Sequence, residues 1–72
     1  MTRDEHLAWC KARALEYVEH GDLQNAVMSM SSDMKKHPET DTPVLAMLTF
    51  SAIRFEISRG ADAVRDWING FN

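Results

Sequence analysis

The stretch GDLQNAVMSMSSDMKKHPET, residues 21–40, decides how this chain folds. Its glycine can adopt the left-handed conformation that ends a helix, and the aspartate after it can cap the start of the next helix. Apolar side chains then recur on one face of a helical wheel, at Leu23, Ala26, Val27, Met30 and Met34. Pro38 ends this pattern. We therefore expect an amphipathic helix that is entered through a tight turn at Gly21.

The residues before this stretch predict a first helix that runs to about His20. The sequence TRDE, residues 2–5, is a capping box in which Thr2 and Glu5 satisfy each other's backbone N–H groups. No glycine or proline follows until Gly21. The apolar face of this helix consists of Leu7, Cys10, Ala14, Tyr17 and Val18.

Two further helices are expected after the loop PETDTP, residues 38–43. Thr42 and Pro43 favour a helix start, so the third helix should run from Pro43 to about Ser58. Its apolar residues fall on two faces, one with Val44, Leu48 and Phe55 and the other with Ala46, Phe50, Ile53 and Ile57. A helix that is apolar on both sides is expected at the centre of the fold, between neighbours. The alternative is a strand over residues 53–57, where apolar and charged residues alternate.

A short fourth helix follows Gly60, with an apolar stripe of Val64, Trp67, Ile68 and Phe71. The fold class is therefore all-α, a compact four-helix bundle in which residues 1–72 form a single domain. A chain of this length buries a marginal core. Its one cysteine, Cys10, excludes an internal disulfide, which gives weight to self-association.

Charge and hydropathy exclude two classes of partner. The net charge is −3, and Lys35–Lys36 is the only adjacent pair among eight basic residues, so we expect no nucleic-acid binding. The longest uncharged stretch near the middle of the chain, TPVLAMLTFSAI at residues 42–53, is too short for a bilayer span, which needs about 20 residues. We expect a cytoplasmic protein that does not bind membranes.

Residues 8–38 resemble a single tetratricopeptide repeat. The matching positions are Ala14, Tyr17, Gly21, Asp22, Ala26, Met34 and Pro38. The resemblance implies an N-terminal helical hairpin held together by small residues. It departs from the family at Trp9, which is one position short of the family's tryptophan, and the expected period of 34 residues is not repeated. A repeat array is therefore not expected.

The whole chain resembles small uncharacterised proteins encoded by phages and prophages, in its length and in its N-terminal sequence MTRDEHLAWCKARALEYVEHGDL. This resemblance assigns no catalytic residue. It implies a phage accessory protein that binds a host or viral protein in the host cytoplasm and modulates it.

The candidate chemistry is weak. His6 and Cys10 have a spacing that suits a metal, but no second pair of ligands follows, and Cys10 lies on the core face. Ser29, Ser31 and Ser32 lack the glycine elbow of a serine nucleophile. We therefore predict no catalytic residue, no metal, no cofactor and no enzymatic activity.

Two surfaces are candidates for binding a protein partner. Trp9 lies opposite the apolar face of the first helix, beside Arg13 and Glu16, and tryptophan is enriched at binding hot spots. The alternative is that the fourth helix covers Trp9, and we expect this coverage while Arg13 and Glu16 stay exposed. The second surface is the flank of the third helix with Phe50 and Ile53, which would form the seam of a homo-oligomer. A third possibility is a small-molecule-sequestering protein, whose pocket would need an oligomer.

Overall fold

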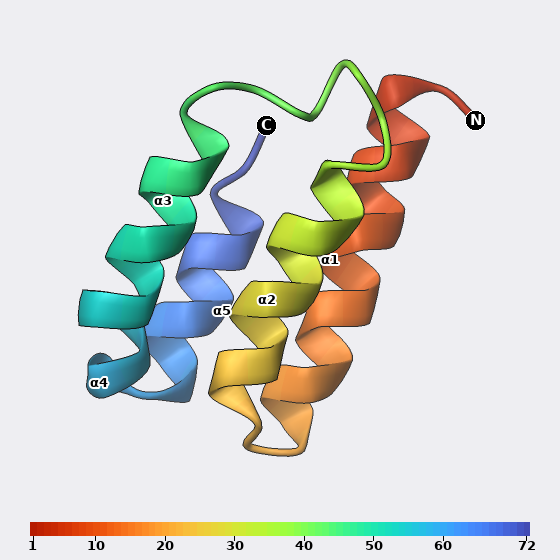
Figure 1. Cartoon of the computed structure of the whole chain (residues 1–72). Coiled ribbons are helices and arrows are strands. Elements are labelled where there is room, and N and C mark those ends of the chain that lie inside the picture. Colours follow the sequence, from red (N-terminus) through yellow and green to blue (C-terminus); the bar gives the residue numbers. More distant parts are fainter.

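The computed structural model describes all residues, 1–72, and consists of four helical rods without a strand. The first two rods are α1 (Arg3–Glu19) and α2 (Leu23–Met34). The third combines α3 (Leu45–Ser51), the π-helix η1 (Ala52–Glu56) and α4 (Ile57–Arg59), and the fourth is α5 (Ala61–Asn69). Successive rods are antiparallel (Figure 1). The prediction of an all-α four-helix bundle is confirmed, and the strand over residues 53–57 is wrong.

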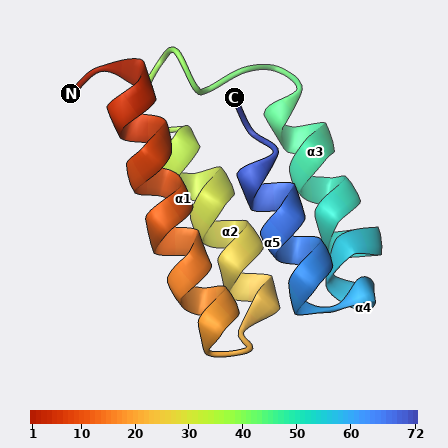
Figure 2. The same ribbon diagram turned by 180° about the vertical axis from the view of Figure 1, so that it is seen from behind.

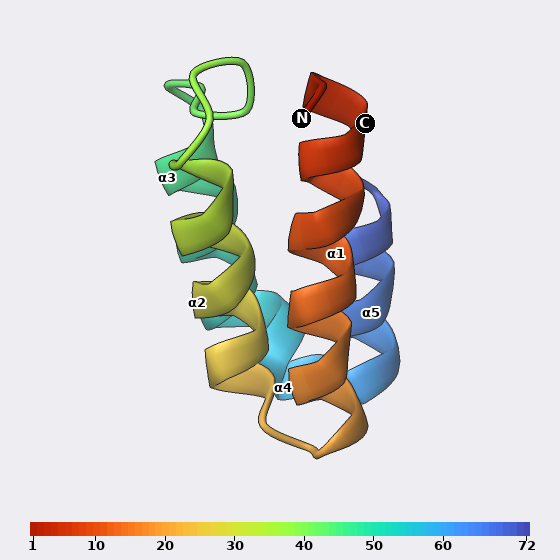
Figure 3. The same cartoon turned by 90° about the vertical axis from the view of Figure 1, so that its right-hand side faces the viewer.

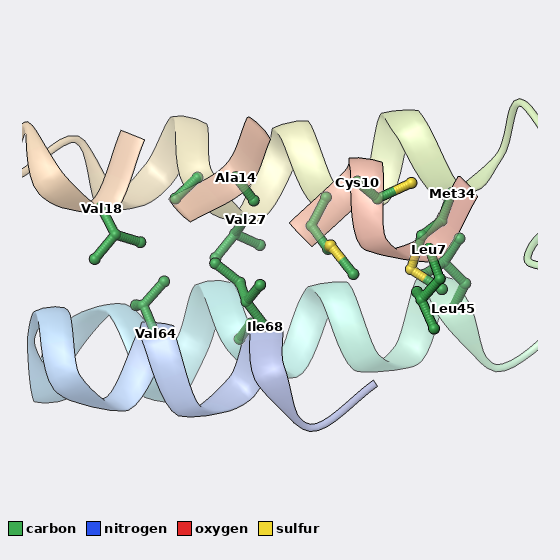
Figure 4. Packing of buried hydrophobic residues seen from close by; sticks show 12 residues of the cluster. Leu7, Cys10, Ala14, Val18, Val27, Met34, Leu45, Val64 and Ile68 are labelled. Carbon is green, nitrogen blue, oxygen red and sulfur yellow. The ribbon is translucent and has the colours of Figure 1, made fainter. Parts of the chain in front are cut away.

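The bundle has two layers, one with α1 and α5 and the other with α2 and α3 (Figure 3). Seen from behind, α5 lies between α1 and the third rod (Figure 2). Twelve buried apolar residues fill the centre of the bundle, and those of α1 and α2 point toward those of α3 and α5 (Figure 4). Ala14 of α1 and Ala26 of α2 have no exposed surface, so these two helices approach closely.

The predicted caps of the first two helices are confirmed. The Thr2 hydroxyl accepts a hydrogen bond from the Glu5 backbone N–H, and the Glu5 carboxylate accepts one from the Thr2 N–H. Hydrogen bonds with Thr2 lower the pKa of Glu5, and the bond from the Thr2 backbone has a larger effect than the bond with its side chain. Gly21 has φ 74°, a conformation that strains any β-branched residue, and the Asp22 carboxylate accepts from the Asn25 N–H.

The third rod begins two residues later than predicted. Thr42 does not cap it with its side chain; Val44 is the capping residue, and the Thr42 carbonyl accepts from the Leu45 N–H. The loop before it is anchored instead by Thr40, whose buried hydroxyl donates to the Met34 carbonyl at the end of α2. The threonine that serves as an anchor is therefore Thr40, and Thr42 is exposed.

A π turn sets which residues of the third rod face the core. The Ile57 N–H donates to the Ala52 carbonyl, five residues earlier. The inward positions are Leu45, Thr49 and Ala52, followed by the partly buried Ile57. In a regular α-helix the next inward position would lie three or four residues after Ala52, at Phe55 or Glu56. The extra residue in the π turn brings Ile57 inward and leaves Phe55 at the surface.

The expectation that the third helix is central is therefore wrong. The rod lies at the edge of the bundle and packs on α2 and α5, while its second apolar face is exposed (Figure 1). None of the other three rods packs on this second apolar face.

The C-terminal end of α5 is attached to α1. The Lys11 ammonium donates to the carbonyls of Asn69, at 3.3 Å, and of Phe71. The Arg3 guanidinium donates to the carbonyl of Asn72. These cations satisfy carbonyl groups that have no partner within the helix and lie at the negative end of its dipole.

Candidate functional site

Trp9 is partly buried, and the groups on its ring come from α1 and from the turn after α2. The Arg13 guanidinium lies 4.7 Å from the ring centre, and the Lys36 ammonium lies 5.5 Å from it. The His6 ring is stacked on the indole, with 5.6 Å between ring centres. Both cations are within the range of a cation–π interaction. The fourth helix was expected to cover Trp9, but the groups on its ring come from α1 itself and from Lys36, two residues after α2 ends.

The same two cations neutralise a buried carboxylate. Asp33 has a side chain that is 3% exposed, and its Oδ2 lies 2.8 Å from Arg13 Nε. Its Oδ1 lies 3.0 Å from Lys36 Nζ. The backbone carbonyl of Asp33 accepts a hydrogen bond from His6 Nε2 at 2.8 Å. Arg13 and Trp9 therefore help to hold α1 against the end of α2, a structural role that competes with use as a free binding surface.

Glu16 lies beside this cluster and is exposed, as predicted for Glu16 and Arg13. It lines a shallow polar hollow of about 350 Å³ together with Arg13, Tyr17 and His20. The Glu16 side chain forms no ion pair, while its backbone carbonyl is 2.7 Å from His20 Nδ1, which caps the end of α1. Among the predicted residues of the first helix, only Glu16 has no partner for its side chain.

Cys10 is a buried thiol with no exposed surface. Its Sγ lies 3.5 Å from His6 Nε2. Burial raises the pKa of the Cys10 thiol, and the charge of Asp33 adds to this effect, so the reactive thiolate is disfavoured. No group of three His, Cys, Asp or Glu side chains is placed to hold a metal ion.

The third rod carries the most apolar surface of the molecule. Six large side chains of the rod, its capping residue included, are exposed, among them Met47 at 73%, Phe50 at 62% and Phe55 at 53%. The other three are Val44, Leu48 and Ile53. Monomeric proteins rarely expose so many neighbouring apolar side chains, and such patches mark interfaces.

A shallow hollow of about 570 Å³ lies on this surface. Its lining, called the α3–η1 face below, consists of Ala46, Met47, Phe50, Ser51, Arg54 and Phe55. Arg54 is the one charged residue of the face, and it forms no ion pair within the chain. Its guanidinium lies 5.6 Å from the ring centre of Phe55.

The two residues predicted for an oligomer seam have different positions. Phe50 lines the α3–η1 face, whereas Ile53 is 41% exposed and lies outside its lining. Sequence reasoning missed Met47, Arg54 and Phe55. The signal for them is the i, i+3, i+4, i+7, i+8 spacing of residues 47, 50, 51, 54 and 55, which defines one helical stripe.

Comparison with known proteins finds no relative: no family profile, no curated protein and no solved structure matches the chain. None of the helices has the length and apolar content needed to cross a membrane.

Proposed function

We propose that this protein acts by binding another polypeptide, without catalysis, and that the α3–η1 face is its binding surface. The observation that carries this proposal is the exposure of three large apolar side chains, Met47, Phe50 and Phe55, around one shallow hollow. With about 200 Å² for each fully exposed side chain of this size, the six exposed apolar residues of the rod present roughly 600 Å².

The composition of the face suits a protein partner. Aromatic residues, methionine and arginine are enriched in the cores of protein interfaces, and the α3–η1 face contains all three. Methionine and phenylalanine provide apolar contact area, and the unpaired Arg54 provides one charged anchor. The surface around Trp9 is the weaker candidate, because Arg13 and Lys36 are already engaged by Asp33.

Two classes of partner fit this proposal. The resemblance to phage-encoded proteins favours a host or viral protein, which the chain would bind in the host cytoplasm. The second candidate is a homo-oligomeric module, favoured by the distribution of large and small side chains on the face.

Affinity capture tests the proposal with a matched pair of variants. Phe50→Glu places a charge on the face at a position that is 62% exposed, so folding should be retained. Met28→Glu makes a similar change on α2, at a methionine that is 44% exposed and lies outside the face. Tagged proteins are incubated with a lysate of the cells that naturally make the chain and with an untagged copy of the chain.

We expect the wild type and Met28→Glu to retain the same polypeptides, quantified by mass spectrometry, and Phe50→Glu to lose them by a factor of at least about 10, since a hot-spot substitution costs about 2 kcal/mol or more. Equal retention by all three proteins would contradict the use of this face.

A further inference from the structure

We infer that a second copy of this chain covers the α3–η1 face, with the two rods antiparallel about a two-fold axis. This inference rests on the proposed use of the face for binding and names its partner. It is carried by the order of side-chain sizes along the face, by the position of its single charge and by its area.

The order of sizes is self-complementary. In an antiparallel pair whose axis passes between Phe50 and Ser51, residues at equal distances from that midpoint lie opposite each other. Phe50 then lies opposite Ser51 of the partner subunit, and Phe55 opposite Ala46 of the partner subunit. Each large ring meets a small side chain, which is how helices interdigitate at close distance.

The remaining pair of the face is Met47 opposite Arg54 of the partner subunit. Both side chains are long and unbranched, so the methylene groups of the arginine can lie along the methionine while the guanidinium reaches the solvent. This arrangement also places the two Arg54 side chains at opposite ends of the interface. A parallel pairing of the rods would bring them together and cost affinity through like-charge repulsion.

The area agrees with a weak dimer. The six exposed apolar side chains of the rod present roughly 600 Å² per copy, of which Met47, Phe50 and Phe55 of the face account for roughly 400 Å². Pairing therefore buries about 800 to 1,200 Å² of apolar surface in total, at or below the lower end of stable protein interfaces. Pairing would remove no carboxylate or amide side chain of the face from water, because its polar side chains are Ser51 and Arg54. A dimer that forms at micromolar concentration is the expected result.

Sedimentation equilibrium of the wild type and two variants tests the inference. Met47→Lys places an ammonium opposite Arg54 of the partner subunit, whereas Met47→Glu places a carboxylate there. Met47 is 73% exposed, so neither variant should unfold the chain. We expect a wild-type dimer, and a dimer of Met47→Glu at least about tenfold tighter than that of Met47→Lys, because the contact occurs twice per dimer.

A rescue variant makes the test specific for this register. Met47→Lys combined with Arg54→Glu again places opposite charges across the axis, and within one chain these two positions are two helical turns apart. This double variant should dimerise more tightly than Met47→Lys alone, although its face carries the same number of charges. A Met47→Lys dimer as tight as that of Met47→Glu, or a double variant that is weaker still, would overturn the antiparallel pairing.

A wild-type protein that stays monomeric up to high micromolar concentration would overturn the second copy as the partner. The capture experiment then separates the two claims. A lysate protein retained by the wild type and lost by Phe50→Glu would leave the binding face in place with another occupant, while equal retention by all variants would remove both claims.

Discussion

Replacing Met30 with alanine should lower the free energy of unfolding by about 2–5 kcal/mol, a large part of the stability of a domain this size. Met30 has no exposed surface and is among the largest fully buried side chains of the core. Removing its thioether leaves a cavity between α2 and its neighbours, which close packing prevents from collapsing completely. The measurement is urea unfolding, followed by far-UV circular dichroism.

Met28→Ala is the matched control for Met30→Ala, because it removes the same atoms from the same helix at a site that is 44% exposed. It should change the free energy of unfolding by no more than about 0.5 kcal/mol. All proteins must be compared at one concentration, since dimerisation adds to the apparent stability. Equal effects of the two substitutions would contradict the orientation of α2.

The second large effect is expected when Arg13 and Lys36 are both replaced by methionine, which keeps the side-chain length. Each single variant leaves Asp33 with one cation, and each cation is about half exposed, so we expect a cost near 1 kcal/mol. The double variant leaves a carboxylate that is 3% exposed without any cation and should cost about 3 kcal/mol or more. The free energies of unfolding thus form a double-mutant cycle that is strongly non-additive.

Lys35→Met serves as the control for this cycle, because Lys35 adjoins Lys36, is exposed and forms no ion pair. It should change the free energy of unfolding by no more than about 0.5 kcal/mol. Should the double variant lose no more than the sum of two small single effects, Asp33 would not be the buried charge described here.

Local sequence signals predicted the elements well. The stripe through Met30 and Met34 gave the buried side of α2, and the capping box at Thr2 and the turn at Gly21 gave helix ends, because these depend on residues close in sequence. The start of the third rod was missed, since the anchoring hydroxyl belongs to Thr40, which bonds six residues back to Met34.

The placement of the third rod and the cover on Trp9 depend on contacts that are distant in sequence. The number of apolar faces on a helix does not state how many neighbours the chain can provide, so the third helix was expected between neighbours, although Phe50 and Ile53 were named as a candidate seam. The π turn at Ala52 brings Ile57, and not Phe55, toward the core. No periodic pattern in the sequence indicates this turn. For Trp9, the usable signal was Asp33, a charged residue one turn from Met30 on the buried side of α2. A buried carboxylate needs cations, and the two that it binds, Arg13 and Lys36, are the ones that lie over Trp9.

The central claim is that the α3–η1 face, and no other part of the surface, is covered by another copy of the chain. Backbone amide chemical shifts, recorded by NMR during serial dilution of the wild type, test it residue by residue. We predict shifts that change with concentration over residues 46–55 and stay constant around Trp9 and Glu16. Concentration-dependent shifts centred on Trp9 and Glu16, or no dependence at any residue, would contradict it.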